Sequence, residues 1–359
     1  MTTVTDAKQS EPGAGPERLS GVVTCIDGRS STVDAGEAGI FECELRTRLS
    51  RHRNLRLAVG DRVEFDRLES DDGVDRGVIE AIAERRSELR RHRENKRDQV
   101  LCANIDQVVI MSAVLEPPYK KAFLDRVLVA AEADGLDALI VIGKCDLLVS
   151  EEHRELVEMD LEVYRELGYG PLFLSTQAED GIEALKERLR GRISVITGPS
   201  GVGKSTFLNA AIPGVQLRTG EVGRSGKGRH VTTTARLLAL PGGGYVADTP
   251  GLRAYGVTGV RAEALPPLFP DFRPFLGGCR FGDCRHWSEP GCAIREALLD
   301  GAIDEGRYES YLKLRDELEQ SEEQRYGGRS GGGETTPTAE GEPTLRRRQP
   351  RRGKGRGKA

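Results

Sequence analysis

The feature that most constrains this chain is a glycine-rich segment in its second half. A short apolar run at residues 193–196 precedes it, and residues 206–211 follow it with the pattern of a helix. A loop in that setting can wrap a phosphate, because glycines let the backbone bend and the helix N-terminus supplies positive potential. The sequence therefore predicts a nucleoside triphosphate site, with a chance match by a glycine-rich turn as the alternative. The segment fits the phosphate-loop pattern and consists of Gly198, Pro199, Ser200, Gly201, Val202, Gly203, Lys204 and Ser205.

Two further positions extend this prediction toward a magnesium-bound triphosphate. Lys204 is expected to reach the β- and γ-phosphates, Ser205 to bind Mg²⁺, and Thr206 to complete the nucleotide contact. Asp248 ends the second apolar run after the loop, and Gly251 lies three residues further on. An aspartate there can hold the magnesium shell through water, and the Gly251 amide can meet the γ-phosphate.

Two segments before the phosphate loop suit recognition of a guanine base. A carboxylate at Asp146 can accept both the N1–H and the N2–H of guanine, which adenine does not offer, and the stem of Lys144 can lie over the ring. Backbone amides at a second loop can bind the guanine carbonyl. Asp146 as a plain helix N-cap is the alternative. The two segments are Gly143, Lys144, Cys145 and Asp146, and Ser175 with Thr176.

The rest of the chain divides around this centre. Residues 99–265 alternate apolar strands (106–111, 138–142, 172–174) with helices (123–133, 151–167, 182–189), which predicts an α/β domain with a parallel sheet and helices on both faces. Residues 19–84 show four short strands separated by turns, at 19–26, 39–45, 61–68 and 76–82, which predicts a small β-barrel of the OB-fold type. A basic linker at 85–98 joins the two.

Both ends of the chain are polar. Residues 1–18 and 319–359 are expected to be disordered, and the second segment ends in a strongly basic tail. Between the α/β domain and this tail, residues 266–318 form a third domain that begins with proline, glycine and cysteine and continues as helices.

The predicted barrel carries a basic loop at residues 46–56. Such a loop on a small barrel can contact RNA phosphates, and a solvated surface loop is the alternative. The overall net charge is −4, so a nucleic-acid partner is indicated only by local basic blocks. The loop contains Arg46, Arg48, Arg51, His52, Arg53 and Arg56.

Three cysteines and a histidine in the third domain have the spacing of a metal site. They offer three thiolates and one imidazole, the closed tetrahedral set of structural zinc, in a glycine-rich setting that is short of core residues. We expect one structural Zn²⁺ per chain, and three buried cysteines with a surface histidine are the alternative. The four residues are Cys279, Cys284, His286 and Cys292.

Taken together, these segments resemble the signature set of translation-factor-type GTPases in rotated order, because the base-reading segments precede the phosphate loop. That order is similar to the circularly permuted GTPases. The preceding barrel, the basic linker and the following cysteine cluster narrow the resemblance to the ribosome small-subunit-dependent GTPase A family (RsgA, also called YjeQ), over residues 19 to 318.

The resemblance implies an OB-fold, a permuted GTPase domain and a zinc domain. It also implies GTP hydrolysis to GDP and phosphate, stimulated by the small (30S) ribosomal subunit and its rRNA, during late maturation of that subunit. The chain departs from the family at Gly143, where asparagine or threonine is usual. Without a side chain at this position the base-binding loop is not tied to the phosphate loop, so guanine selectivity should survive through Asp146 while affinity is weaker.

Hydrolysis needs a residue that positions water. Leu252 stands where many GTPases have a glutamine, and it cannot serve. In the family a histidine at the place of His230 is a proposed catalytic residue, and an exposed loop histidine is the alternative. Thr233 is the expected magnesium ligand because residues 232–236 resemble the pattern of related GTPases, with Thr232 as the other choice.

The sequence also bounds where the chain acts. It shows no apolar signal segment and no run long enough to cross a membrane, and its seven unevenly spaced cysteines do not suggest a disulfide framework. We expect a cytoplasmic monomer. A phosphate-loop kinase leaves the Asp146 and Thr176 loops unexplained, and a non-catalytic RNA-binding protein predicts that no ribosomal subunit stimulates hydrolysis.

Overall fold

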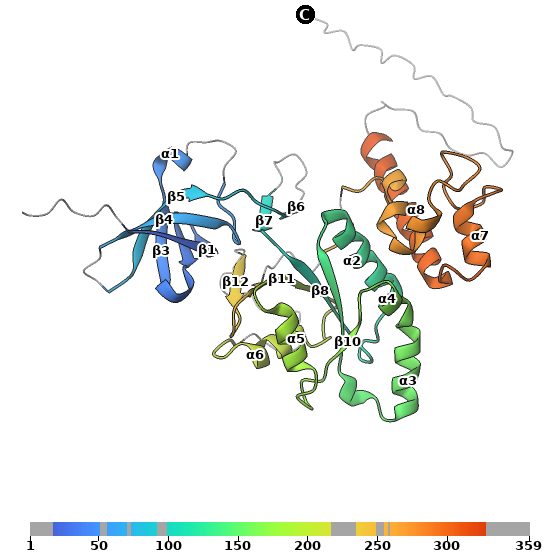
Figure 1. Ribbon diagram of the computed structural model, residues 1–359, viewed down its shortest axis with the longest axis horizontal. Helices are drawn as coiled ribbons and strands as arrows, with labels where there is room; N and C mark the ends of the chain where they lie inside the picture. Colours follow the sequence, from blue (N-terminus) through green and yellow to red (C-terminus); the bar gives the residue numbers. More distant parts are fainter. Residues whose placement is uncertain are drawn as a thin grey trace, which may run out of the picture.

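The computed structural model describes residues 17–50, 56–69, 73–91, 99–216, 235–248, 255–257 and 259–327. The described chain forms a barrel, an α/β domain and a mostly helical C-terminal module (Figure 1). Most of the two segments expected to be disordered lies outside these residues. None of the described helices is both long and apolar enough to cross a membrane.

The N-terminal unit is a closed five-stranded barrel. Its strands follow the order β1-β2-β3-β5-β4, and β4 pairs back onto β1 to close it. β3 and β5 are parallel and the other pairs are antiparallel. This topology fits an OB-fold and confirms the prediction, although β2 was not predicted. The elements are β1 (Arg18–Asp27), β2 (Ser30–Asp34), η1 (Gly36–Ala38), β3 (Ile40–Leu45), α1 (Thr47–Ser50), β4 (Arg62–Leu68) and β5 (Arg76–Ile82).

The barrel core follows from strand alternation, since every second side chain points inward. These inward residues are apolar and almost wholly buried. Phe41 and Phe65 are in contact at its centre, with ring centroids 5.0 Å apart. The core consists of Val23, Val33, Phe41, Cys43, Val63, Phe65 and Ile79.

The segment predicted as a basic linker is partly a β-hairpin, formed by β6 (Glu88–Arg91) and β7 (Gln99–Ala103). The hairpin is fixed to the barrel because Arg85 donates to the buried carboxylate of Asp61, at 2.6 Å from Nε to Oδ1. The backbones of the barrel and the hairpin are also close together at Gly60, where a Cβ would lie 2.1 Å from the Ala103 carbonyl oxygen. The linker therefore holds the barrel in one place on the next domain.

The central sheet is built as predicted. Its order is β10-β9-β8-β11-β13-β12, and all neighbours are parallel except β12 with β13. All seven residues of β8 are buried, which is expected of a strand covered on both faces. The strands are β8 (Gln107–Ala113), β9 (Asp137–Gly143), β10 (Leu172–Phe173), β11 (Ile193–Thr197), β12 (Arg236–Ala239) and β13 (Tyr245–Asp248).

Helices cover both faces of this sheet. One core joins α2 and α4 to Val108 and Ile110 of β8, and the other joins α5 and α6 to Val109 and Met111. The helix predicted at 151–167 is divided at Leu161 into α3 and α4. The helices are α2 (Lys121–Asp134), η2 (Cys145–Leu147), α3 (Glu151–Asp160), α4 (Glu162–Glu166), α5 (Ile182–Leu189) and α6 (Lys204–Ala211).

The barrel and the α/β domain share one continuous sheet. Cys25 of β1 pairs with Arg236 of β12. Nearby, the hydroxyl of Tyr245 in β13 donates to the Asp34 carboxylate in β2, at 2.9 Å. The barrel is therefore bonded to β12 and to β13, the strand at whose end the expected γ-phosphate sensor begins.

The C-terminal module is mainly helical and packs on α2 through α8 (Figure 1). α8 continues to Gly327, so the expectation of disorder from residue 319 is wrong for residues 319–327. Side-chain pairs four residues apart support this polar part, as when Gln320 donates to the Asp316 carboxylate at 2.8 Å. The elements are η4 (Ala262–Ala264), η5 (Pro266–Leu268), η6 (Pro270–Phe275), α7 (Ala293–Leu299) and α8 (Glu305–Gly327).

A buried guanidinium holds this module against α2. Arg307 of α8 is 1% exposed and donates to Asp125 of α2 at 2.7 Å and to Asp271 of η6 at 2.7 Å. Burial opposes its charge, yet the hydrogen bonds that it donates to Asp271 and the negative charge of Asp125 hold the pKa of Arg307 above its ordinary value. Tyr164 donates to the same Asp125 carboxylate at 2.9 Å. The guanidinium of Arg307 thus links α8 to α2 and η6 directly, and to α4 through Asp125 and Tyr164.

Replacing Arg307 with methionine should lower the free energy of unfolding by about 3–5 kcal/mol, because Asp125 loses the cation that compensates its burial. Burial already raises the pKa of Asp125, so the variant can protonate this carboxyl and its deficit should shrink as pH falls. Urea unfolding followed by the fluorescence of Trp287, the only tryptophan, measures this. The control is Arg126→Met, which breaks an exposed pair with Glu317 and should cost at most about 1 kcal/mol. Equal losses in the two variants would contradict the assignment.

Candidate nucleotide and metal sites

The predicted phosphate loop joins β11 to α6, in the context that the motif requires. Its glycines have backbone conformations that other residues rarely adopt, with φ of 152° at Gly198, 83° at Gly201 and 100° at Gly203. A Cβ at Gly198 would lie 2.0 Å from the Met111 carbonyl oxygen of β8. The loop can therefore sit this close to the neighbouring strand only with glycine at that position.

The side chain of Lys204 bends back over the loop. Its Nζ donates to the carbonyl of Gly198 at 2.7 Å and to that of Pro199 at 2.5 Å. The ammonium group thus lies at the loop whose backbone amides are expected to hold phosphate. Ser205 is half-buried and Thr206 is exposed. Both lie in the first turn of α6, which begins at Lys204, and are therefore next to the helix N-terminus.

The two predicted base-reading loops meet in space. The Ser175 hydroxyl donates to the Asp146 carboxylate at 2.6 Å, and the Cys145 amide donates to the Leu174 carbonyl at 3.2 Å. Ser175 also accepts from the Ala178 amide at 3.1 Å, which fixes the turn that contains Thr176. Asp146 itself is exposed. A carboxylate oriented by a neighbouring hydroxyl, yet open to solvent, can accept the paired N–H groups of a purine.

A third loop, residues 114–120 between β8 and α2, contacts both parts of the site and was missed in the sequence. Lys144 donates through its Nζ to the Glu116 carbonyl. Pro117 lies 3.8 Å from the position that a Cβ of Gly201 would take. The only sequence signal was the proline pair after an apolar strand. This loop supports the lysine that is expected to stack on the base.

Gly143 lies between the base-reading segment and the phosphate loop. A Cβ there would lie 3.2 Å from the Val202 carbonyl oxygen and 3.4 Å from that of Ser112. The backbone of Gly143 has no positive φ, so a side chain is compatible with its conformation. The position is thus close enough for a polar side chain to link the two segments.

The expected γ-phosphate sensor begins at the same edge of the sheet. β13 runs parallel to β11, with Ala247 opposite Val195, so Asp248 is the last residue of its strand and lies at the same edge of the sheet as the phosphate loop. The remaining predicted residues of the nucleotide site lie outside the described part of the chain: His230, Thr232, Thr233, Gly251 and Leu252. Of the predicted basic loop, Arg51, His52 and Arg53 also lie outside it.

The predicted metal ligands come together in the C-terminal module. The ligand atoms of Cys279, Cys284, His286 and Cys292 all lie within 4.8 Å of one another. The sulfurs of Cys279 and Cys292 are each 3.4 Å from Nδ1 of His286. Tetrahedral zinc with bonds of about 2.3 Å to sulfur and about 2.1 Å to nitrogen separates such atoms by about 3.6 Å. The donor set therefore fits zinc.

Protonation and support of this cluster agree with a metal site. Burial lowers the pKa of His286, which favours the neutral imidazole that a metal needs, and raises the pKa of the Cys284 thiol to about 12, so a thiolate there requires a cation. α8 holds the ligand loop, since Tyr308 donates to the His286 carbonyl at 2.7 Å. Although burial opposes it, backbone amides such as that of Arg285 hold the pKa of Glu289 at about 2, and this carboxylate closes the loop.

Comparison with known proteins identifies the family to which this chain belongs. The sequence model described as RsgA GTPase matches residues 82–258. A protein from Chlorobaculum parvum named small ribosomal subunit biogenesis GTPase RsgA is 43% identical over 313 residues, which cover 85% of this chain and 99% of that protein. The chain belongs to the RsgA GTPase family. A Klebsiella pneumoniae protein of the same name is 39% identical, over 85% of this chain and 86% of its own length.

Solved structures agree with membership of the RsgA GTPase family. YjeQ from Thermotoga maritima superposes with a TM-score of 0.69 at 38% identity, over 84% of this chain and 99% of its own. YloQ, described as a circularly permuted GTPase, gives a TM-score of 0.69 at 27% identity, over 87% and 99%. The predicted family and the permuted GTPase fold are thus confirmed, and this RsgA-family chain is a GTP hydrolase.

Asp146→Asn should weaken GTP binding by about 100-fold, because two charge-assisted hydrogen bonds to guanine are lost. The same variant should prefer xanthine nucleotides, whose 2-carbonyl accepts from the new amide. Titration of fluorescent guanine and xanthine nucleotides measures both affinities. An unchanged preference for GTP would remove Asp146 from the base site.

Gly143→Asn should tighten GTP binding by about fivefold, because the added amide can donate to the Val202 carbonyl. The matched control is Gly143→Ala, which adds the Cβ without a donor and should bring no gain. If both variants bind GTP equally, the asparagine that is usual in the family does not act by this link.

Proposed function

We propose that this chain hydrolyses GTP to GDP and phosphate while bound to the small ribosomal subunit, and that it assists late maturation of that subunit. The observation that best supports GTP as the nucleotide is the 2.6 Å hydrogen bond from the Ser175 hydroxyl to the Asp146 carboxylate. It joins two base-reading loops at the edge of the sheet where the phosphate loop and Asp248 also lie. The ribosomal part is supported by the name shared by the curated relatives.

The nucleotide contacts divide among these loops. The 198–206 segment holds the phosphates, with Lys204 at the β- and γ-phosphates. Asp146, Lys144 and the 175–176 turn hold guanine. Ser205, Thr233 and, through water, Asp248 would hold Mg²⁺, which would neutralise charge on the phosphates. The Gly251 amide meets the γ-phosphate.

His230 positions the attacking water, since Leu252 has no polar side chain. We infer that the subunit stimulates hydrolysis by fixing the 219–234 segment, so that His230 and Thr233 close over the γ-phosphate. Ordering of a segment through γ-phosphate and magnesium contacts is a general switching mode. Release of these contacts after hydrolysis then frees the protein from the subunit.

The barrel contacts rRNA through the basic loop 46–56, together with the 85–97 segment. Two arginines of the 46–56 loop are held in place by the buried carboxylate of Glu80. Arg48 donates to it at 2.8 Å, and Arg46 forms an ion pair with it. Their side chains remain 67% and 46% exposed. An arginine fixed at its base and open to solvent can contact a phosphate with little loss of side-chain entropy.

The remaining assignments are part of the same proposal. One structural Zn²⁺ per chain is held by the Cys279, Cys284, His286 and Cys292 set, and the protein acts as a cytoplasmic monomer. The domains are 19–84, 85–98, 99–265 and 266–318, with α8 extending the last of these to Gly327.

Wild-type hydrolysis should be stimulated by purified small subunits and not by large subunits. His230→Ala should lose about 100-fold or more of the stimulated rate, because the water is no longer positioned. Its GTP-dependent binding to the small subunit should stay intact, as measured by co-sedimentation. Full stimulation of His230→Ala would exclude the histidine. Absence of stimulation of the wild type by either subunit would overturn the function itself.

Protein purified without added metal should contain one Zn²⁺ per chain by elemental analysis. Cys284→Ser should lose it and loosen the C-terminal module, as limited proteolysis would show, while fluorescent GDP still binds. The matched control is Cys43→Ser, which alters a buried cysteine of the barrel core and should leave the zinc content at one. Zinc-free wild-type protein with an intact module would contradict the site.

A further inference from the structure

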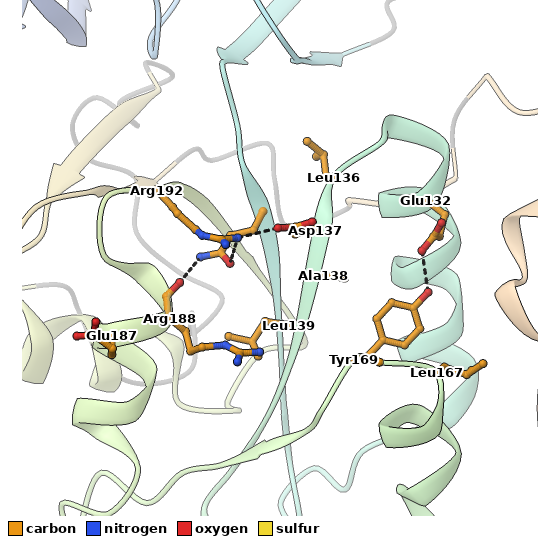
Figure 2. A pocket seen from close by; sticks show the side chains of 12 residues that line it. Glu132, Leu136, Asp137, Ala138, Leu139, Leu167, Tyr169, Glu187, Arg188 and Arg192 are labelled. Atoms are coloured by element: carbon orange, nitrogen blue, oxygen red, sulfur yellow. Dashed lines mark hydrogen bonds and ion pairs between the residues drawn. The ribbon is translucent and has the colours of Figure 1, made fainter.

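A groove lies at the end of the GTPase sheet opposite the nucleotide loops (Figure 2). Its cavity volume is about 480 Å³, and it surrounds the first half of β9. Helix α5 with Arg188 forms one side, and α2 with Tyr169 forms the other. None of the residues assigned to the nucleotide or to zinc lines it.

The backbone of β9 has an open edge in this groove. β10 pairs only with Val141 and Ile142. It does not extend further because Gly168 and Gly170 have φ of 87° and 41°, which bends the chain away before Leu172. The first half of β9 therefore has β8 as a neighbour on one side and the groove on the other.

Ala138 presents its peptide groups to this open side. The Asp137 amide donates to the Asp106 carbonyl before β8, and the Gly143 carbonyl accepts from Val114 after β8. The backbone N–H and C=O groups of odd-numbered residues in β9 thus point toward β8, and those of even-numbered residues point to the opposite side. The bond from the Leu174 amide to the Ile142 carbonyl confirms this alternation. Within the described ranges, nothing pairs with the outward amide and carbonyl of Ala138. Such an edge is a template for another extended chain.

The carboxylates around the groove are already compensated. Each has a cation within 2.8 Å, and Glu132 also accepts from the Tyr169 hydroxyl at 2.9 Å. The pairs are Glu132 with Arg273, Asp137 with Arg192, and Glu187 with Arg190.

Arg188 is different. Its side chain is directed into the groove, across Leu139 (Figure 2). Among the described residues no carboxylate pairs with it. The groove therefore combines an open strand edge with one uncompensated guanidinium, which is complementary to a carboxylate.

We propose that this groove binds an extended segment of a partner protein, which pairs its backbone with Ala138 and places an aspartate or glutamate side chain against Arg188. Main-chain hydrogen bonds supply affinity in this mode, and the side-chain contact supplies selectivity. The proposal does not depend on the ribosomal function.

The probe is a pool of capped peptides, acetyl-Xaa-Val-Glu-Val-Xaa-amide, with a matched pool in which glutamine replaces glutamate. Binding to the full-length, isotope-labelled, GDP-loaded protein is followed by NMR. At millimolar concentration the glutamate pool should shift the Ala138 amide and the Arg188 guanidinium resonances. The glutamine pool should bind about tenfold more weakly, because the charge-assisted bond is missing. If neither pool moves these resonances, the proposal is overturned.

Two variants test the Arg188 contact and the backbone pairing separately. Each variant should bind GDP as the wild type does, which shows that it is folded. Arg188→Gln should bring the two pools to equal affinity. Ala138→Pro removes an amide that the sheet does not use, which a strand edge tolerates, and it should abolish the shift at Arg188. A pool N-methylated at the central residues should fail to bind the wild type. Equal binding of the methylated pool would show that no strand pairing occurs and would overturn the proposal.

Discussion

The parallel pairing of β8 with β9 on one side and with β11 on the other determines where the nucleotide loops lie. All seven residues of β8 are buried, and they alternate between the two helical layers. Because parallel strands end at the same edge, the segments after β9 and β11 meet there, whatever their order in the chain. The rotated order of motifs therefore leaves the site intact. Gly198 shows how tight this pairing is, since any Cβ would collide with β8.

The permutation also changes what lies on either side of the GTPase unit. The sensor strand β13 is bonded to the barrel through Tyr245 and Asp34, and its partner β12 pairs with β1 of the barrel. On the other side, Arg307 fixes the C-terminal module on α2, and α2 begins directly after the loop that supports Lys144. Both flanking units thus contact elements that lead to the nucleotide loops. This arrangement gives a physical basis for a hydrolysis rate that responds to what the barrel and the C-terminal module bind.

Much of this architecture could be predicted from the sequence, because its strongest signals are local. The phosphate loop, the cysteine spacing and the apolar strands each identify themselves within a few residues. The β2 strand was missed because its buried Ser31, which donates to the Cys43 carbonyl, interrupts the apolar pattern. The end of α8 was missed because its last turns are polar and are stabilised by contacts four residues apart. The support of Lys144 by Glu116 depends on a tertiary contact between distant segments, which no local pattern reveals.

We propose that the nucleotide bound to this protein controls its affinity for the small ribosomal subunit. The most direct measurement is the Kd of the full chain for purified small subunits, with a non-hydrolysable GTP analogue and with GDP at equal saturation. We expect a Kd at least about tenfold lower with the analogue, and by linkage an equal rise in the affinity for the analogue relative to that for GDP when the subunit is bound. Equal Kd values in the two nucleotide states would contradict it.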